Sequence, residues 1–235
     1  MNILSKISPP ATLLLLSTSA RMRSLLKLTL MDLVLKGVLK LEIKHQELEQ
    51  ARRKIAVWYV CQGRNFERYR PPKPYELIFL QPFYEEPIRV TFRDLVRVAF
   101  RNARGIDLFK RSVIKSEGIE QYVTRSFWKK LYGGHSLTKE GIGLQKQLIS
   151  HLADVDRNMN HFFQTDPKSA LHLLINLRGN ILLLKNVQFK LIESLDYQQL
   201  VQQYQFDYSA DWKFYESMFF EKMWLDFFDL SITEF

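Results

Sequence analysis

Cysteine is nearly missing from this chain of 235 residues, which holds only Cys61. A single cysteine cannot form an internal disulfide or a cysteine-based metal site, so nothing in the sequence indicates an oxidising compartment. We expect Cys61 to be a small strand residue beside Val60. Glycine and proline are also scarce, with 9 and 8 residues, so turns are few. The chain should therefore be built from long elements, mainly helices.

Long apolar runs are missing as well. No stretch approaches the roughly 20 apolar residues that a membrane-spanning helix needs. The short apolar run at residues 13–16 follows Pro9 and Pro10 and is too short for the core of a secretory signal. We expect a cytoplasmic protein whose contact with a membrane would be peripheral.

The sequence also lacks catalytic and metal-binding motifs. The chain has five histidines, and none belongs to an HExxH pattern: His45, His135, His151, His161 and His172. The glycines near Lys139 do not have the spacing of a phosphate-cradling loop, and no serine lies in a nucleophile elbow. We expect no enzyme activity, no metal and no cofactor.

Charge, in contrast, is abundant and uneven. The formal net charge is +9, with 32 basic and 16 acidic residues in positions 1–190, and 2 basic and 9 acidic residues in positions 191–235. A basic body attracts a polyanion, so we expect an anionic membrane surface or a nucleic acid as partner. The acidic tail, rich in aromatics, could lie on the body, compete with that partner or recruit another protein.

The first half of the chain shows a mixed pattern. Apolar spacing predicts a helix from residue 19 that ends at Gly37, followed by a short strand. A charged helix is predicted at 44–53 and a strand at 55–60. The proline-rich segment that follows is a connector, because its Pro-Pro-Lys-Pro sequence cannot continue a helix.

The second half begins with a helical block near Thr91, where Thr-Phe-Arg-Asp resembles a capping signal. Residues 119–137 indicate an aromatic β-hairpin that closes at Gly133-Gly134. A helix is predicted at 138–161, and a largely apolar one at 166–195, opened by Asp-Pro, should form the centre of the fold.

Two blocks, 19–60 and 91–140, share one order of elements: helix, glycine, short strands. This order is typical of winged-helix units. We therefore predict a mainly α fold with short β-hairpins, in which winged-helix-like units are fused around a central apolar helix. Residues 1–200 would form the basic domain and residues 201–235 the acidic, aromatic C-terminal tail.

Three arginines recur at helical spacing, Arg97, Arg101 and Arg104. Guanidinium groups grip phosphate oxygens bidentately and stay charged, so this spacing predicts a phosphate site on one helix face. A solvated basic face without a ligand has the same spacing and stays open. A basic winged helix can also enter the major groove of DNA, although few amide or hydroxyl side chains accompany these arginines.

Two segments resemble the Golgi phosphoprotein 3 family: LMDLVLKGVLKLE at 30–42 and FRNARGIDLFKRSVIKSEGI at 100–119. The likeness covers about residues 20–195. It implies a phosphoinositide-binding protein in which Arg101 and Arg104, the arginines of an Arg-Asn-x-Arg motif, hold the head group. It also implies a hairpin, about 119–135, that is pressed into the bilayer.

The tip of that hairpin combines apolar and basic residues. Its membrane-contact residues would be Phe127, Trp128, Leu131 and Tyr132, beside Arg125, Lys129 and Lys130. This composition is typical of an interfacial membrane contact. The same aromatics could equally belong to the core.

Overall fold

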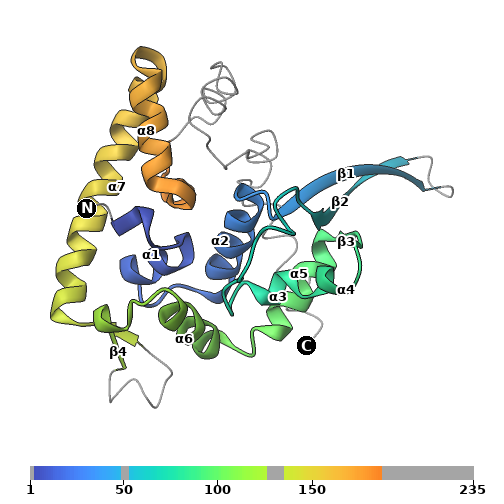
Figure 1. Ribbon diagram of the computed structural model, residues 1–235, viewed down its shortest axis with the longest axis horizontal. Coiled ribbons are helices and arrows are strands. Elements are labelled where there is room, and N and C mark those ends of the chain that lie inside the picture. The colour runs from blue at the N-terminus through green and yellow to red at the C-terminus, as the bar shows by residue number, and fades with distance from the viewer. Residues whose placement is uncertain (1–2, 49–52, 126–134, 187–235) are drawn as a thin grey trace.

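The computed structural model describes residues 3–48, 53–125 and 135–186, and it is mainly helical with two small antiparallel sheets (Figure 1). The α-helices are α1 (Pro9–Leu16), α2 (Met22–Leu35), α3 (Leu77–Leu80), α4 (Pro82–Glu85), α5 (Phe92–Asn102), α6 (Ile106–Ser116), α7 (Lys139–Thr165) and α8 (Pro167–Leu177). Short 3-10 helices are η1 (Ile3–Ser5), η2 (Glu120–Tyr122) and η4 (Arg178–Leu183). The strands are β1 (Leu39–Leu48), β2 (Arg53–Gln62), β3 (Val90–Thr91), β4 (Val123–Arg125) and β5 (His135–Leu137).

Helix α2 lies at the centre of the molecule (Figure 1). It contacts α1, η4 and β1, and most of its residues are buried, including Leu25, Leu26 and Leu30. A helix that is apolar on most sides must be covered by neighbours on most sides, because each exposed leucine would forgo roughly 2 kcal/mol of burial. The core is therefore built around this early segment.

The prediction of one central helix at 166–195 is wrong. Helix α8 ends at Leu177, Arg178 has a φ of 48°, and the chain continues as η4. Tertiary contacts hold this break: the Asn180 side chain donates to the carbonyls of Leu4 and Ile7, at 2.8 and 2.9 Å. Helix α8 lies along α7 at the edge of the fold (Figure 1), and residues 187–195 are outside the described residues.

The charged helix predicted at 44–53 is also wrong: residues 44–48 belong to β1 and Arg53 begins β2, while residues 49–52 lie outside the described residues. Strand β1 pairs with β2 in a continuous antiparallel register from Leu39 opposite Gln62 to Leu48 opposite Arg53. Leucine and isoleucine alternate with lysine and glutamate along its first half, which is the period of a strand. The glutamates, glutamine and lysines favour helix locally, but pairing with the β-branched β2 overrides that preference.

The sheet order is β1-β2-β3, and the β1–β2 hairpin projects away from the helices (Figure 1). The predicted strand at 55–60 is confirmed as part of β2. In the second sheet β4 pairs with β5, which confirms an antiparallel hairpin within residues 119–137. The predicted closure at Gly133-Gly134 is wrong, because Arg125, not residue 132, lies opposite His135. The closing residues 126–134 lie outside the described part of the chain.

Two helices end in the same way. After α2, the Val38 amide donates to the Leu33 carbonyl at 3.0 Å, and after α6 the Ile119 amide donates to the Ile114 carbonyl at 3.1 Å. In both places a glycine with a φ of 64° precedes the donor residue, namely Gly37 and Gly118. This is a Schellman motif, and each time it leads into an antiparallel hairpin.

Helix starts follow local signals closely. The Thr91 side chain accepts from the Asp94 amide at 3.1 Å and begins α5, and Thr138 accepts from the Gly141 amide at 3.0 Å and begins α7. Both predicted helix starts are confirmed. The connector between β2 and β3 contains two single helical turns, α3 and α4, where the sequence predicted no regular structure.

Candidate functional site

The three arginines lie where α5 passes into α6. Arg101 and Arg104 are exposed, and Arg97 is half-buried one turn earlier. Arg97 and Arg101 share a face of α5 because they are four residues apart. Arg104 is not part of that helix: it follows the last helical residue, Asn102, and has a φ of 52°. The prediction of a single helix face thus holds for two of the three residues.

The chain turns between α5 and α6 within two residues. Arg104 and the next residue, Gly105, both have positive φ, at 52° and 97°. Helix α6 begins directly after Gly105, and no side chain caps its first amides. The N-terminal end of a helix carries a partial positive charge and free N–H groups, so it adds to the field of the nearby guanidinium groups.

Carboxylates do not neutralise Arg101 or Arg104 within the described residues. Neither arginine forms an ion pair or hydrogen bond with another described side chain. The nearest acidic residues in sequence are engaged: Asp94 accepts from the Thr91 hydroxyl at 2.6 Å, and Asp107 interacts with Lys110 and His135. Other exposed basic residues on α5 and α6 are Arg93, Arg111 and Lys115.

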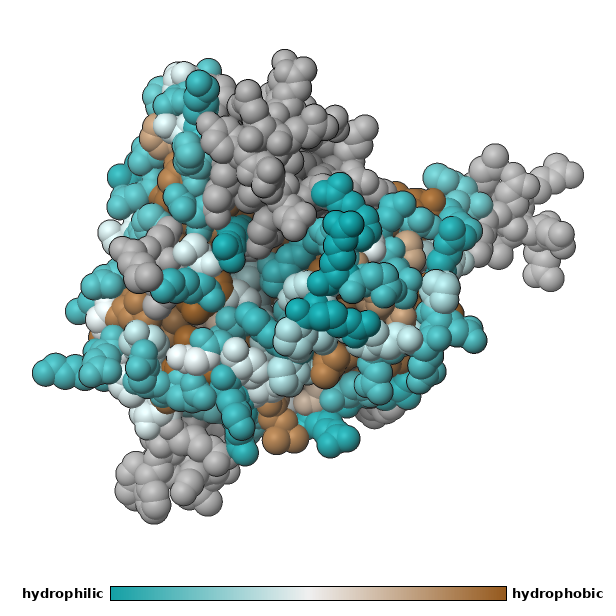
Figure 2. Space-filling view, viewed as in Figure 1, coloured by the Kyte–Doolittle hydropathy of each residue, from teal (hydrophilic) through white to brown (hydrophobic). Residues whose placement is uncertain are grey.

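Two large apolar side chains near the arginines in sequence are partly exposed. Phe100 is 44% exposed and Leu108 is 49% exposed. Phe100 directly precedes Arg101, and Leu108 follows Arg104 by four positions, so the two arginines are flanked by apolar residues along the junction. Figure 2 shows a small hydrophobic patch between hydrophilic side chains near the α5–α6 turn, at the lower edge of that view. We name Phe100, Arg101, Arg104 and Leu108 the junction surface.

An open hollow of about 500 Å³ adjoins the junction surface. It lies between the connector helices and the end of α5. Its lining residues are Pro74, Leu77, Ile78, Gln81, Pro82, Glu85, Asn102 and Arg104. Leu77 is itself 37% exposed. The lining of the hollow therefore combines apolar side chains with amide, carboxylate and guanidinium groups.

The sequence predicted the arginines but missed Phe100 and Leu108. Both sit in amphipathic helices, where a large apolar residue normally faces the core, so no local signal marked them as exposed. Their exposure depends on where α5 ends and how the chain turns. The predicted membrane-contact residues Phe127, Trp128, Leu131 and Tyr132 lie outside the described residues, as does the tail 201–235.

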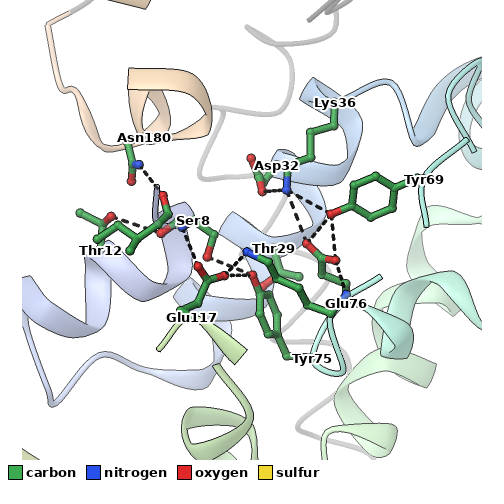
Figure 3. Close-up of polar contacts among 12 residues, drawn as sticks. Ser8, Thr12, Thr29, Asp32, Lys36, Tyr69, Tyr75, Glu76, Glu117 and Asn180 are labelled. Carbon is green, nitrogen blue, oxygen red and sulfur yellow. Dashed lines mark hydrogen bonds and ion pairs between the residues drawn. The ribbon is translucent and has the colours of Figure 1, made fainter. Parts of the chain in front are cut away.

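A network of largely buried polar side chains links the connector, the segment between β2 and β3, to α1, α2 and the end of α6 (Figure 3). In its first half, Lys36 donates to the carboxylate of Asp32 at 2.6 Å and lies 3.5 Å from that of Glu76. The Tyr69 hydroxyl donates to Glu76 at 2.9 Å. Burial would lower the pKa of Lys36, but the charges of Asp32 and Glu76 raise it well above the ordinary value. Lys36 is therefore charged at neutral pH.

The second half centres on Glu117, whose side chain is only 1% exposed. Its carboxylate accepts from Lys73 at 2.7 Å, from the Tyr75 hydroxyl at 2.5 Å and from the Ser8 amide at 3.1 Å. Burial alone would raise the pKa of Glu117, but the Lys73 charge and these hydrogen bonds hold it below the ordinary value. Burial and the Glu117 charge raise the pKa of Tyr75 strongly, so Tyr75 stays a donor.

These eight residues, the buried ionic network, join α1, α2, the connector and the end of α6: Ser8, Asp32, Lys36, Tyr69, Lys73, Tyr75, Glu76 and Glu117. Each carboxylate has a cation as partner, and Glu76 and Glu117 accept from further donors, so the network is suited to holding these segments together. No local signal could predict it, since Ser8 and Glu117 are 109 positions apart.

Among the described residues, no three His, Cys, Asp or Glu side chains are grouped closely enough to hold a metal ion. No helix within residues 3–48, 53–125 and 135–186 is long and apolar enough to cross a bilayer. Compared with protein-family models, with curated proteins and with solved structures, the chain has no significant match in any of the three.

Proposed function

We propose that this chain is a non-enzymatic, cytoplasmic, peripheral membrane protein that binds anionic lipid head groups, phosphoinositides among them, at the junction surface. The observation that carries the proposal is the pairing of two exposed arginines, Arg101 and Arg104, with two exposed apolar side chains, Phe100 and Leu108. Arg97 extends the basic face by one turn of α5.

The basic and the apolar residues of the junction surface suit different depths of a membrane. Guanidinium groups bind phosphate oxygens with paired hydrogen bonds, and each basic residue near an anionic membrane contributes about 1 kcal/mol. Phenylalanine and leucine can enter the boundary between head groups and acyl chains, where their burial adds to the binding. A nucleic acid would gain less from them, because base reading depends on hydrogen-bonding side chains.

The resemblance to the Golgi phosphoprotein 3 family supports the same proposal, since it assigns the head group to Arg101 and Arg104. We also propose that residues 19–60 and 91–140 are two winged-helix-like units. The repeated order of helix, Schellman glycine and antiparallel hairpin supports this interpretation. In such a fold residues 126–134 would be a second membrane contact.

Liposome flotation tests the proposal. The wild-type chain should float with phosphatidylcholine vesicles that contain phosphatidylinositol phosphates or phosphatidylserine, and not with pure phosphatidylcholine. Arg101→Ala combined with Arg104→Ala should lose most of this binding, because about 2 kcal/mol is removed. Comparison of the two anionic lipids separates head-group recognition from general charge attraction.

The matched control is Lys146→Ala combined with Arg157→Ala. Both residues are exposed on α7, so the control removes the same charge away from the junction surface. Equal flotation of the wild type and the Arg101/Arg104 variant would reject this site. A duplex-DNA shift at the same salt concentration that depends on these arginines, without flotation, would assign the surface to nucleic acid instead.

A further inference from the structure

The outer edge of β1 has no partner strand among the described residues. In the three-stranded sheet, β1 pairs with β2 on one side only. Helix α2 contacts β1, and Leu39 and Leu41 are buried, whereas the hairpin beyond them projects away from the helices (Figure 1). A strand edge without a partner is a template for another strand, and proteins usually shorten, cover or pair such edges.

The alternation of hydrogen bonds between β1 and β2 shows which backbone groups of β1 point away from β2. The Gly63 amide donates to the Val38 carbonyl at 2.8 Å, and the register places residue 39 opposite 62. In an antiparallel ladder the bonded residues alternate, so Lys40, Glu42 and Lys44 direct their backbone groups toward β2. The backbone groups of residues 39, 41, 43 and 45 therefore point out of the open edge.

This alternation permits β1 to pair with a second β1. In an antiparallel dimer centred on Ile43, residue 43 lies opposite its own copy, and residue 42 lies opposite residue 44. The outward-pointing residues 41, 43 and 45 then meet one another, as the ladder requires. Glu42 and Lys44 fall on positions without direct hydrogen bonds, where cross-strand side chains are closest.

The charges match in this register. Glu42 of each copy faces Lys44 of the other, which gives two opposite-charge pairs related by the two-fold axis. Lys44 is exposed and forms no ion pair with a described residue, so it is available for such a contact. Glu42 is held ionised: its pKa is lowered by a hydrogen bond from Lys40, although burial opposes this, and the charge of Arg89 adds to the effect.

The apolar side chains match as well. Ile43 is 40% exposed and lies opposite the half-buried Trp58 within the hairpin. Pairing at Ile43 would join two such pairs into one apolar row across four strands. The exposed part of Ile43 would then contact its own copy rather than water.

We propose that this protein forms a two-fold dimer through edge-to-edge pairing of β1, with Ile43 on the axis and Glu42 opposite the Lys44 of the second copy. The dimer is independent of the lipid-binding proposal. Lysine on an edge strand often prevents pairing. A dimer centred one residue later would place Lys44 against Lys44, which the charges exclude. A dimer centred on Leu41 would place Glu42 opposite Lys40, but Leu41 is buried within its own chain whereas Ile43 is 40% exposed, so burial favours the register centred on Ile43.

Charge reversal tests the register. In sedimentation velocity of the full chain, Glu42→Lys and Lys44→Glu should each weaken self-association by about tenfold or more, since each creates two like-charge pairs. An equimolar mixture of the two variants should recover a dimer, because every lysine of the Glu42→Lys chain would face a glutamate of the Lys44→Glu chain. Lys40→Glu tests the register: it removes the ion pair with Glu42 within each copy, but position 40 lies opposite Gln46, so self-association should stay nearly unchanged, whereas a dimer centred on Leu41 would be weakened.

Amide hydrogen exchange of the wild type provides a test that needs no variant. Exchange at the Ile43 amide should slow as the protein concentration rises, while the Lys44 amide, which is bonded to β2, should not change. A chain that stays monomeric up to high micromolar concentration overturns the proposal. A dimer that is insensitive to both reversals, or is not restored by mixing, also overturns it.

Discussion

Lys36 shows how single residues hold this fold together. Its ammonium group lies in a largely buried place, with Asp32 and Glu76 as partners and the Tyr69 hydroxyl 3.3 Å away. A buried pair contributes little net stability compared with well-packed apolar residues, but removal of one partner leaves a buried charge uncompensated and costs roughly 3–5 kcal/mol. The buried ionic network is therefore sensitive to change at any of its members.

Glu117→Gln should lower the free energy of unfolding by roughly 2 kcal/mol at pH 7, because Lys73, Tyr75 and Ser8 lose a charged acceptor, while the partly exposed Lys73 can still be hydrated. Urea denaturation of the variant and of the wild type measures the difference. Glu120→Gln is the matched control: Glu120 is exposed near the same helix end and should change stability by less than about 0.5 kcal/mol. An equal effect of the two substitutions would contradict the role of Glu117.

The carboxyl group of Glu117 should also make the stability of the protein depend on pH. The pKa of Glu117 is lower in the folded chain than its ordinary value of 4.5. Its contribution is therefore complete above that value and is lost as the pH falls through the folded pKa. Lys36 acts at alkaline pH: because its pKa is raised in the folded chain, its contribution to stability is lost only as the pH rises through that folded pKa. Urea midpoints should decline below about pH 4.5, and less steeply in Glu117→Gln.

At the scale of elements, threonine side-chain caps mark the starts of α5 and α7. Thr91 and Thr138 each accept a hydrogen bond from the third residue of the following helix. Such caps satisfy an amide that no helical carbonyl can reach. The start of α5 matters for the candidate site, because it sets the position of Arg97 and Arg101 on the helix surface.

Thr91→Ala should therefore destabilise the protein by about 1 kcal/mol, since the Asp94 amide loses its acceptor. Thr91→Ser keeps the hydroxyl and serves as the control, with a change of a few tenths of a kcal/mol. Thermal or urea unfolding followed by circular dichroism measures both. Equal stability of the alanine variant and the wild type would show that the cap adds nothing.

At the scale of the whole molecule, charge is divided between the body and the C-terminal segment. Residues 1–190 hold 32 basic and 16 acidic side chains, whereas residues 191–235 hold 2 and 9. An acidic segment tethered to a basic body competes with any polyanionic ligand, because it is present at a high effective concentration.

Deletion of residues 204–235 should strengthen liposome binding several-fold at low salt, as this competition is removed. The gain should shrink above about 0.5 M salt, where charges are screened over a few ångströms. A tail of the same length with its acidic residues changed to Asn and Gln is the control, and it should behave like the deletion. Unchanged affinity of both variants at low salt would remove the competition hypothesis.

Local signals explain which parts of the fold could be predicted. The caps at Thr91 and Thr138, the glycine after α2 and the β-branched run of β2 act within a few residues, so the sequence identified them. The charged segment 44–48 was misread, because its composition favours helix while its pairing partner lies in β2. The break at Arg178 was missed because distant groups, the Leu4 and Ile7 carbonyls, hold η4 in place.

By itself the sequence determined the class of the fold, the uneven charge and the arginines of the candidate site, because composition and short-range spacing carry that information. Only the tertiary structure decided that α2 is the central helix, that Phe100 and Leu108 face solvent beside Arg101 and Arg104, and that β1 presents an open edge among the described residues. These features depend on which distant segments meet. Burial is a property of the packed chain, so a single residue's type cannot determine it.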